Sequence, residues 1–565
     1  NRKAPPKPPP LSQVHPMPKT LAVIDAETDP FMFGYVPAPF AWGLYDGDSF
    51  YRFWGDDCTE QLIRFLADKN YLLYAHNGGK FDFFFLLEYL TKGKITITNG
   101  RIIKADLMGN ELRDSYSIFP MPLSAYKKDD IDYNKFTEEN REANKAEIID
   151  YLEGDCVYLY ELVKAFRERF GNKLTIASTA MQELKERIAD GRKFDNFSIG
   201  KDEKFRQYYY GGRCQAFKKG KLSGDYKIID INSAYPYAMI HQHPSPFITD
   251  FEIITGDLPQ KEVYFATIEA VSRGALPFKQ GDGSLTFPTD DKPRIYSVTG
   301  WETRAGLETN TLDVLNVIDC RVPVHTIDFK AYVLPIYEDK KQAKASADKV
   351  GELLAKLLLN SSYGKFALNP MKYKDWVLVT CGDHPELNAD QVAYKELINA
   401  GYSADLIEAP PAYQLQQSLP QYDLDVYSID NPKEDGFYNV TVAASITGFV
   451  RAYLWRAICA AEDPVYCDTD SIICKSYSVE INKELGGWDL EGEASAVWIA
   501  GKKIYAAELI EGGFKTACKG ARLTPEEIKI ISEDKNAVIE WKNDAPTFSM
   551  KRGTSFIERE IRQTG

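Results

Sequence analysis

Three runs of strand-forming residues in this 565-residue chain lead into acidic side chains. T-L-A-V-I-D-A-E-T contains Asp25 and Glu27, Y-K-I-I-D-I contains Asp230, and V-Y-C-D-T-D-S contains Asp468 and Asp470. Alternate side chains of a strand point to one face, so the acids of each close pair lie side by side. Two unpaired carboxylates about 4 Å apart repel by about 4 kcal/mol at an effective dielectric of ~20. A lone D-x-D is most simply part of a solvated hairpin, but repeated acid-ended strands predict at least two carboxylate centres that need a positive partner.

Composition limits the class of protein. The length allows several domains. The formal net charge of −14 argues against attraction of the whole surface to nucleic acid, so a nucleic-acid site has to be a local basic channel. Nine cysteines form no CxxC pair and no Cys/His ladder, which indicates neither a zinc site nor a disulfide framework and fits a reducing cytosol. No apolar run reaches membrane-spanning length and no signal peptide is visible, so we expect a cytoplasmic protein without a membrane partner.

The order of the segments predicts a multidomain α/β plus α+β protein. Residues 1–20 begin with the basic, proline-rich N-R-K-A-P-P-K-P-P-P, which is typical of an extended, disordered tail. Strand and helix patterns alternate from residue 21 to about 200, as in an α/β domain. A junction rich in tyrosine and glycine follows, and then mixed β segments, helices and a long loop-rich insertion.

The first predicted centre draws four acids from three elements. Asp25 and Glu27 share one face of a strand. Asp82 ends A-H-N-G-G-K-F-D and enters an apolar helix, where an unpaired acid is costly. Tyr151 and Asp155 lie at i and i+4 on one helix face. Singly, each acid is more typical of a surface charge. Together they could hold two divalent metal ions about 4 Å apart, one to activate water and one to stabilise the leaving oxygen of a phosphodiester.

The second predicted centre combines Asp230 with Asp468 and Asp470, a trio that could hold two Mg²⁺ ions. The helix ending in N-S-S-Y-G carries a lysine, an amide, an aromatic ring and a glycine on one stripe. This stripe suits a triphosphate and a base pair better than a core, although an ordinary amphipathic helix is the alternative. A locally basic stretch further on could follow a phosphate backbone. The stripe is Lys356, Asn360, Tyr363 and Gly364, and the basic stretch contains Lys503, Tyr505, Lys519 and Arg522.

Several motifs occur in the order found in family B DNA polymerases. They are Y-x-G-G, D-I-N-S-A-Y-P, K-L-L-L-N-S-S-Y-G, T-G-F-V-R, Y-C-D-T-D-S and K-I-Y. In the first centre, the pattern resembles the DxE, Nx₃FD and YxxxD triplet of proofreading 3′–5′ exonucleases. The short length and the Y-x-G-G junction are similar to the protein-primed branch from small phages, tectiviruses and linear plasmids. The resemblance covers most of residues 21–522 and implies that metal ions are the positive partners of the acids.

The resemblance also implies a fold and its domains. A ribonuclease H-like 3′–5′ exonuclease domain would precede a right-hand polymerase with palm, fingers and a small thumb, interrupted by two terminal-protein-region insertions. The implied segments are the tail 1–20, exonuclease 21–200, palm 201–244, first insertion 245–340, fingers 341–369, second insertion 370–440, palm 441–522 and thumb 523–565.

Roles in the polymerase half are implied residue by residue. Asp230 and Asp470, with Ile231, would hold the metal ions, and Asp468 would be a third essential acid. Tyr235 would lie under the incoming sugar and exclude a 2′-hydroxyl, with Ser233 beside it. Lys356 would meet the triphosphate, and Asn360, Tyr363 and Gly364 would contact the nascent pair. Template would be guided by Tyr209, Gly211, Gly212 and Arg213, and the primer strand held by Thr447, Arg451, Lys503 and Tyr505, with Lys519 on the backbone.

Roles in the exonuclease half follow in the same way. Asp25, Glu27 and Asp155 would hold metal ions. Asp82, Tyr151 and Lys128 would complete the catalytic site. DNA would be bound by His76, Asn77 and Ser115, and Tyr116 stands where the family has leucine.

Partners and alternatives complete the expectation. The resemblance implies a monomer that binds primer and template DNA, deoxynucleoside triphosphates and a terminal priming protein in the host cytoplasm, with two Mg²⁺ (or Mn²⁺) ions per centre. In relatives the first insertion engages the priming protein, and the second encircles DNA to give processivity and strand displacement. The alternatives are a primer-independent family B polymerase and an exonuclease whose polymerase half only clamps DNA. A non-catalytic scaffold conflicts with the intact acids.

Overall fold

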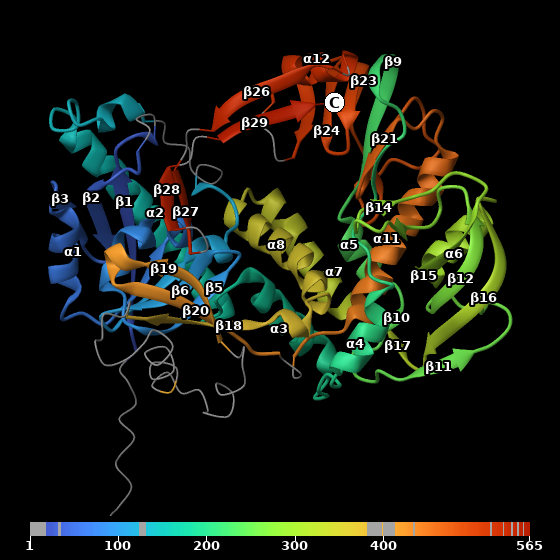
Figure 1. Cartoon of the computed structure of the whole chain (residues 1–565), viewed down its shortest axis with the longest axis horizontal. Helices are drawn as coiled ribbons and strands as arrows, with labels where there is room; N and C mark the ends of the chain where they lie inside the picture. Colours follow the sequence, from blue (N-terminus) through green and yellow to red (C-terminus); the bar gives the residue numbers. More distant parts are fainter. Residues whose placement is uncertain are drawn as a thin grey trace, which may run out of the picture. The chain divides into compact units, whose positions relative to one another are not determined.

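In the computed structural model the chain forms two compact units, which we describe separately. Figure 1 labels their helices and strands and colours them in chain order. Unit 1 comprises Asn1–Gly171, Trp376–Ser428 and Pro546–Ser555, and unit 2 comprises Asn172–Asp375, Ile429–Ala545 and Phe556–Gly565. The structure describes residues 18–31, 35–123, 131–380, 398, 413–432, 436–519, 523–534, 536–543, 546–550, 553–556 and 559–564. Most of the predicted tail 1–20 therefore lies outside the described residues, and Thr20 already begins a strand.

Unit 1 is built on a ten-stranded mixed sheet in the order β19-β20-β18-β5-β6-β7-β4-β1-β2-β3. The central pairs β1–β4 and β4–β7 are parallel, and β2, β3, β5 and β6 join antiparallel. This is the α/β arrangement that the alternating patterns predict. The strands are β1 Thr20–Thr28, β2 Pro39–Tyr45, β3 Phe50–Trp54, β4 Tyr71–Ala75, β5 Gly93–Thr98, β6 Arg101–Leu107, β7 Asn110–Asp114, β18 Lys374–Val379, β19 Tyr413–Leu419 and β20 Leu424–Asp430.

Helix α2 (Lys145–Phe170) packs on β1 and β2, and a glycine allows this close approach. A Cβ on Gly43 would lie 2.9 Å from Leu152 and 3.1 Å from Cys156 Sγ, both on α2. The shorter helices of unit 1 are α1 (Cys58–Leu66) and the 3₁₀ segments η2 (Gly78–Lys80) and η3 (Asp82–Tyr89). The apolar helix expected after Asp82 is thus a 3₁₀ helix.

The predicted second insertion, 370–440, is not a separate body in the described residues. Its strands β18, β19 and β20 extend the unit 1 sheet, where Trp376 of β18 pairs with Ile95 of β5. Leu378 and Val426 join the apolar core beneath that sheet. Pairing covers an edge strand whose backbone groups would otherwise be open. Residues 381–397 and 399–412, in the middle of the insertion, lie outside the described residues.

Unit 2 contains an antiparallel seven-stranded sheet in the order β25-β24-β23-β9-β22-β21-β8. The helix α11 (Val440–Ala460) is buried on nearly all sides, as expected for an apolar core helix. It packs against α5 (Ala234–Met239), α4 (Ile199–Arg206) and α6 (Gly300–Glu308). The strands are β8 Cys214–Ala216, β9 Gly220–Ile231, β21 Tyr466–Asp468, β22 Ser471–Cys474, β23 Trp488–Gly501, β24 Ile504–Leu509 and β25 Phe514–Cys518.

The first insertion forms a four-stranded sheet, β11-β16-β12-β15, which packs on α6. Its strands are β11 Phe251–Ile254, β12 Phe265–Ser272, β15 Pro293–Thr299 and β16 Leu312–Pro323. Four smaller strands join in two pairs: β10 (His243–Pro244) with β17 (Thr326–Ile327), and β13 (Phe278–Lys279) with β14 (Leu285–Thr286).

Helices α7 (Lys330–Ala345) and α8 (Lys349–Phe366) form a hairpin, and α3 (Ile176–Ala189) packs on both. Two predicted boundaries shift as a result. Residue 340 falls inside α7, so the helical hairpin begins earlier than the predicted fingers. The residues after Gly171 belong to unit 2 rather than to the domain predicted to end at 200, because the apolar face of α3 is covered by α8.

The predicted thumb, 523–565, is divided between the units. Helix α12 (Pro525–Glu533) packs on β23, and β26 (Val538–Asn543) pairs with β29 (Arg559–Thr564). The hairpin of β27 (Pro546–Ser549) and β28 (Gly553–Phe556) belongs to unit 1, where Phe548 is buried against Phe81 and Phe84. None of the helices in the described part of the chain combines the length and apolar character needed to cross a bilayer.

Candidate active centres

The three acids of unit 2 lie at neighbouring strand ends. Strands β21 and β22 form a hairpin, and β22 pairs with β9 so that Ser471 lies opposite Asp230. The turn between the acids is tight: Thr469 has a φ of +58°, and Asp470 N donates to Asp468 O at 2.6 Å. Ile231 N donates to Asp470 O at 2.8 Å, which ties the two acid-bearing segments together.

Lys503 supplies a positive partner for the first acid of the D-x-D pair. Its Nζ donates to both carboxylate oxygens of Asp468 at 2.7 Å. Asp470 and Asp230 form no ion pair with a described residue, and both are perturbed. Burial, reinforced by Asp468, raises the pKa of Asp470 to about 6. Burial, reinforced by Asp470 and then Glu491, raises the pKa of Asp230 to about 8.

A divalent cation fits this donor set chemically. Carboxylates held close together favour protonation because each charge repels the other, and a hard cation with oxygen ligands relieves that repulsion. Among the residues that the structure describes, no three or more His, Cys, Asp or Glu side chains are gathered into a metal-binding cluster. The side chain of Ile231 has no donor atom, so only its backbone carbonyl oxygen could be a metal ligand. The two-metal arrangement stays a prediction in both units.

The four predicted acids of unit 1 lie close enough to interact electrostatically, and their joint role as metal ligands stays a prediction. Asp25 and Glu27 lie on β1, and α2 carries Asp155 against it. Burial raises the pKa of Asp25 well above its usual range, followed by repulsion from Asp82, Glu27 and Asp155. Burial, followed by repulsion from Asp155 and Asp82, raises the pKa of Glu27 well above its usual range. Ala26 N donates to Asp82 Oδ1 at 3.1 Å, and burial raises the pKa of Asp82 to about 7.

Tyr151 belongs to the same cluster. Burial raises the pKa of its hydroxyl, and the carboxylate charges of Asp155 and Glu27 add to the effect. The phenol therefore stays protonated and able to donate a hydrogen bond. Lys128 and Arg522, which the sequence analysis placed at the two centres, lie outside the described residues.

Comparison with known proteins identifies the family. Residues 120–278 and 324–411 match the family described as DNA polymerase type B, organellar and viral. The chain is 38% identical over 577 residues to the DNA-directed DNA polymerase of Enterobacteria phage PRD1, covering 96% of this chain and 98% of that protein. This chain belongs to the type B DNA polymerases. The DNA polymerase of Bacillus phage phi29 is 26% identical over 288 residues, 46% of this chain and 48% of that protein.

Solved structures confirm the fold. The phi29 DNA polymerase complexed with primer-template DNA and incoming nucleotide substrates superposes with a TM-score of 0.71 at 18% identity, covering 96% of this chain and all of that one. The complex of phi29 DNA polymerase with single-stranded DNA gives 0.68 over the same share. These likenesses confirm the predicted multidomain α/β plus α+β fold.

The predicted nucleotide stripe lies on one face of α8 in the polymerase. Lys356, Asn360 and Gly364 are exposed, and Tyr363 is half-buried. Tyr363 stacks on Tyr235 of α5, with ring centroids 4.1 Å apart and planes 10° apart. Burial raises the pKa of Tyr235 to about 12. The stack therefore joins the α8 stripe to the segment that follows Asp230.

Sequence reasoning missed Lys340, on α7. Its Nζ donates to Ser233 Oγ at 3.4 Å, and Ser233 has a φ of +57°. Burial lowers the pKa of Lys340, and the neighbouring cation of Lys356 lowers it further. The side chains of Lys340 on α7 and Lys356 on α8 are thus neighbours. The run E-D-K-K-Q-A-K, which precedes α8, could have indicated Lys340, because it places several lysines on the helix before the stripe.

Several predicted DNA contacts are buried and instead position other groups. The Arg213 guanidinium is 1% exposed, donates to Gly274 O at 2.7 Å and stacks on the Phe287 ring. Arg451 is 2% exposed, and Thr447 donates to Ala444 O. The core of unit 2 encloses these three side chains, and their predicted contacts with DNA stay predictions. Tyr505 is also buried and packs on Tyr466, whereas Tyr209 is half-buried and Gly211 and Lys519 are exposed.

The predicted DNA-binding residues of unit 1 form a bonded network. His76 Nε2 donates to Met121 O at 2.8 Å, its Nδ1 lies 3.0 Å from Ser115 Oγ, and burial lowers its pKa to about 4. Asn77 Oδ1 accepts from Arg101 Nη1 at 2.9 Å. The Arg101 guanidinium lies 4.4 Å from the centre of the Tyr116 ring, which gives the residue in the leucine position a cation–π partner.

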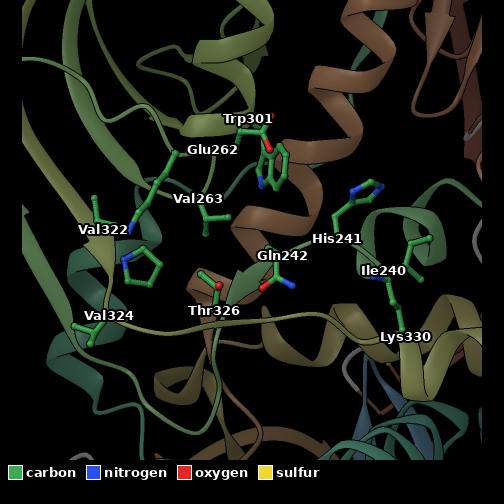
Figure 2. A pocket seen from close by; sticks show the side chains of 12 residues that line it. Ile240, His241, Gln242, Glu262, Val263, Trp301, Val322, Val324, Thr326 and Lys330 are labelled. Carbon is green, nitrogen blue, oxygen red and sulfur yellow. The ribbon is translucent and has the colours of Figure 1, made fainter.

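A cavity of about 480 Å³ in unit 2 lies apart from the three acids, none of which lines it. Figure 2 shows His241 and Lys330 on one side, and Val322 and Val324 on the other. Trp301, from the first turn of α6, also borders it.

Proposed function

We propose that this chain is a replicative DNA-directed DNA polymerase with a proofreading 3′–5′ exonuclease, acting as a monomer in the host cytoplasm. One observation supports the polymerase centre most directly. The Tyr235–Tyr363 stack places the exposed α8 stripe beside the segment that carries Asp230. Acids that can hold metal ions and a lysine that can meet the phosphates are groups that phosphoryl transfer uses, and the stacked rings would lie beside them.

In the proposed reaction the 3′-hydroxyl of the primer attacks the α-phosphate of a deoxynucleoside triphosphate, and pyrophosphate leaves. Mg²⁺ or Mn²⁺ held by Asp230 and Asp470, two ions per centre, would supply charge stabilisation at the phosphates. Lys356 and Lys340 would bind the triphosphate, and Tyr235 would exclude a 2′-hydroxyl. Lys503 would keep Asp468 paired and contact the primer strand.

The proposed exonuclease centre is in unit 1. Asp25, Glu27 and Asp155 would hold the ions that activate water at the 3′-terminal phosphodiester. Tyr151 would donate a hydrogen bond, since its raised pKa keeps its proton in place. The mutual perturbation of these carboxylates supports the proposal, because catalytic acids are where such shifts concentrate.

We also propose that synthesis starts from a terminal priming protein that docks on the first insertion. Several large apolar side chains of the sheet in that insertion are exposed to solvent, and exposed apolar surface is typical of protein contact sites. Ile253 on β11 is 62% exposed and Ile295 on β15 is 61% exposed. Leu315 and Ile318 add to them from β16, at its register shifts.

A single set of incubations tests the proposal. The purified chain is given Mg²⁺, labelled deoxynucleotides and a template strand, with and without a primer, and separately a 3′-labelled single strand. We expect extension of the primed template and degradation of the single strand. Incorporation without any primer would favour the primer-independent alternative. Degradation without extension would favour an exonuclease whose second half only clamps DNA.

A further inference from the structure

A buried ion pair in unit 2 joins the first insertion to the helix that carries T-G-F-V-R. Glu302 lies in the first turn of α6, Arg451 lies in α11, and both side chains are almost fully buried. Arg451 Nε donates to Glu302 Oε1 at 2.7 Å. The two helices meet closely because Gly448 has no side chain: a Cβ there would lie 2.3 Å from Thr299 Oγ1.

The carboxylate of Glu302 is fixed by its own helix. Its Oε2 accepts from Thr299 N at 3.0 Å and from Thr299 Oγ1 at 2.8 Å, which caps α6. Its Oε1 is left for Arg451. Glu302 therefore presents one oriented, buried charge toward α11, and charge-assisted hydrogen bonds of this kind set geometry as well as attraction.

The far side of the guanidinium holds backbone of the Y-x-G-G junction. Arg451 Nη1 donates to Tyr210 O at 2.7 Å and to Gly211 O at 2.8 Å. Among the described residues, Nη2 has no hydrogen-bond partner. The orientation of the guanidinium thus rests on Glu302 at one end and on two carbonyl groups at the other.

The next residues of the junction contact the turn between the polymerase acids. A Cβ on Gly212 would lie 2.9 Å from the Thr469 side chain, so only glycine fits there without a shift. Thr469 N donates to the carbonyl oxygen of Arg213 at 2.6 Å. A displacement of the junction would therefore be passed to the D-T-D turn.

We propose that Glu302, although it belongs to the first insertion, is a positioning residue for polymerisation. It orients Arg451, which holds the carbonyl groups of Tyr210 and Gly211 and so sets the junction against the turn at Thr469. This inference deepens the proposed polymerase function and rests on it. It assigns the insertion a direct part in the geometry of synthesis, separate from any partner that it binds.

The test separates positioning from folding with an apolar replacement of the pair. Well-packed apolar residues commonly replace a buried ion pair without loss of stability, whereas removing one partner leaves an uncompensated charge. The double variant Glu302→Leu/Arg451→Met leaves no unpaired charge, so its melting temperature should fall only by the loss of the α6 cap at Thr299 and stay above that of Arg451→Met alone, but it cannot donate to the carbonyl groups. We expect kcat for single-nucleotide incorporation on a primed template to fall about 10- to 100-fold, since small misplacements at a reacting centre cost about that much. KM for the deoxynucleotide and single-strand degradation should change less than twofold.

A matched control comes from the same two helices. Arg456 of α11 donates to Glu308 of α6 at 2.7 Å, but this pair is partly exposed and lies away from the junction. Glu308→Gln should leave kcat unchanged. Arg451→Lys, which can pair with Glu302 but lacks the guanidinium fork, should lower kcat as the double variant does.

The opposite results are distinct. Wild-type kcat in the double variant would show that the pair only stabilises the fold, and would overturn the inference. A wild-type chain that incorporates no deoxynucleotide would overturn the proposed function itself, and the inference with it.

Discussion

The proposed choice of sugar rests on two residues, Tyr235 and Tyr363. Their stack, at 4.1 Å and 10°, fixes the Tyr235 ring next to the segment of Asp230. A fixed ring excludes a 2′-hydroxyl by size rather than by hydrogen bonding. We expect Tyr235→Val to raise ribonucleotide incorporation relative to deoxyribonucleotide about 10- to 100-fold, the range in which steric pockets discriminate. Matched single-turnover assays with the two nucleotides measure this ratio.

Tyr235→Phe is the control for this substitution, because it keeps the ring and removes only the hydroxyl. Its ratio should stay close to that of the unchanged chain. An unchanged ratio in Tyr235→Val would assign the selection of sugar to another side chain.

The raised pKa values of Asp230 and Asp470 predict how pH acts on stability. The usual pKa is 3.8, and folding raises it to about 8 for Asp230 and about 6 for Asp470. A group with a raised pKa binds its proton more tightly in the folded state, so its contribution is lost as the pH rises from about 4 to about 8. Melting temperatures of the chelator-treated chain should fall across that range, and Mg²⁺ should restore them.

Asp230→Asn isolates this contribution from the other perturbed acids. Between about pH 5 and pH 8, the melting temperature of the variant should fall less than that of the unchanged chain. It should also rise less when Mg²⁺ is added. An identical pH profile in the variant would mean that Asp230 is not perturbed as the structure indicates.

At the scale of elements, the α7–α8 hairpin brings together two lysine side chains, one from each helix. Burial, followed by the neighbouring cation of Lys356, lowers the pKa of Lys340, and a bound triphosphate would relieve the repulsion between the two lysines. We expect Lys340→Ala to raise the deoxynucleotide KM about tenfold or more, since a hydrogen bond to a charged group contributes about 1.5–3 kcal/mol. Steady-state incorporation at varied deoxynucleotide concentration measures the change.

Lys341→Ala is the matched control, because Lys341 precedes α7's last turn but pairs with Glu484 instead. It should leave KM unaltered, and the affinity for primed DNA should be the same in both variants. Equal effects of the two substitutions on KM would mean that Lys340 contributes only its positive charge and no specific contact with the triphosphate.

How much of this could be predicted from the sequence depends on how local the pattern is. The acid-ended strands and the α8 stripe were predictable because each is set by spacing within one element. The addition of β18 to the sheet beside β5 was not, since the two strands are far apart in the chain and their pairing leaves no local mark. The backbone partners of Arg213 and Arg451 were not predictable for a related reason: a basic side chain beside a junction can turn outward to solvent or inward to backbone, and only packing decides.

At the scale of the whole molecule, the two acidic centres belong to different compact units, each with its own core. Substitutions that share no interaction partners have nearly additive effects. Loss of either set of acids should therefore remove one activity and leave the other. The proposed proofreading function would need this independence, because the same primer end would be either extended or trimmed.

Two variants test that independence in opposite directions. Asp470→Ala should lower primer extension by three orders of magnitude or more, roughly the scale on which electrostatic stabilisation contributes to phosphoryl transfer, while single-strand degradation stays within about twofold. Asp25→Ala/Glu27→Ala should abolish degradation and leave extension intact. Both are measured on one gel system, with a 5′-labelled primer in the presence and absence of deoxynucleotides. Parallel loss of both activities in either variant would contradict separate centres, because it would show that the acids of one unit support the chemistry of the other.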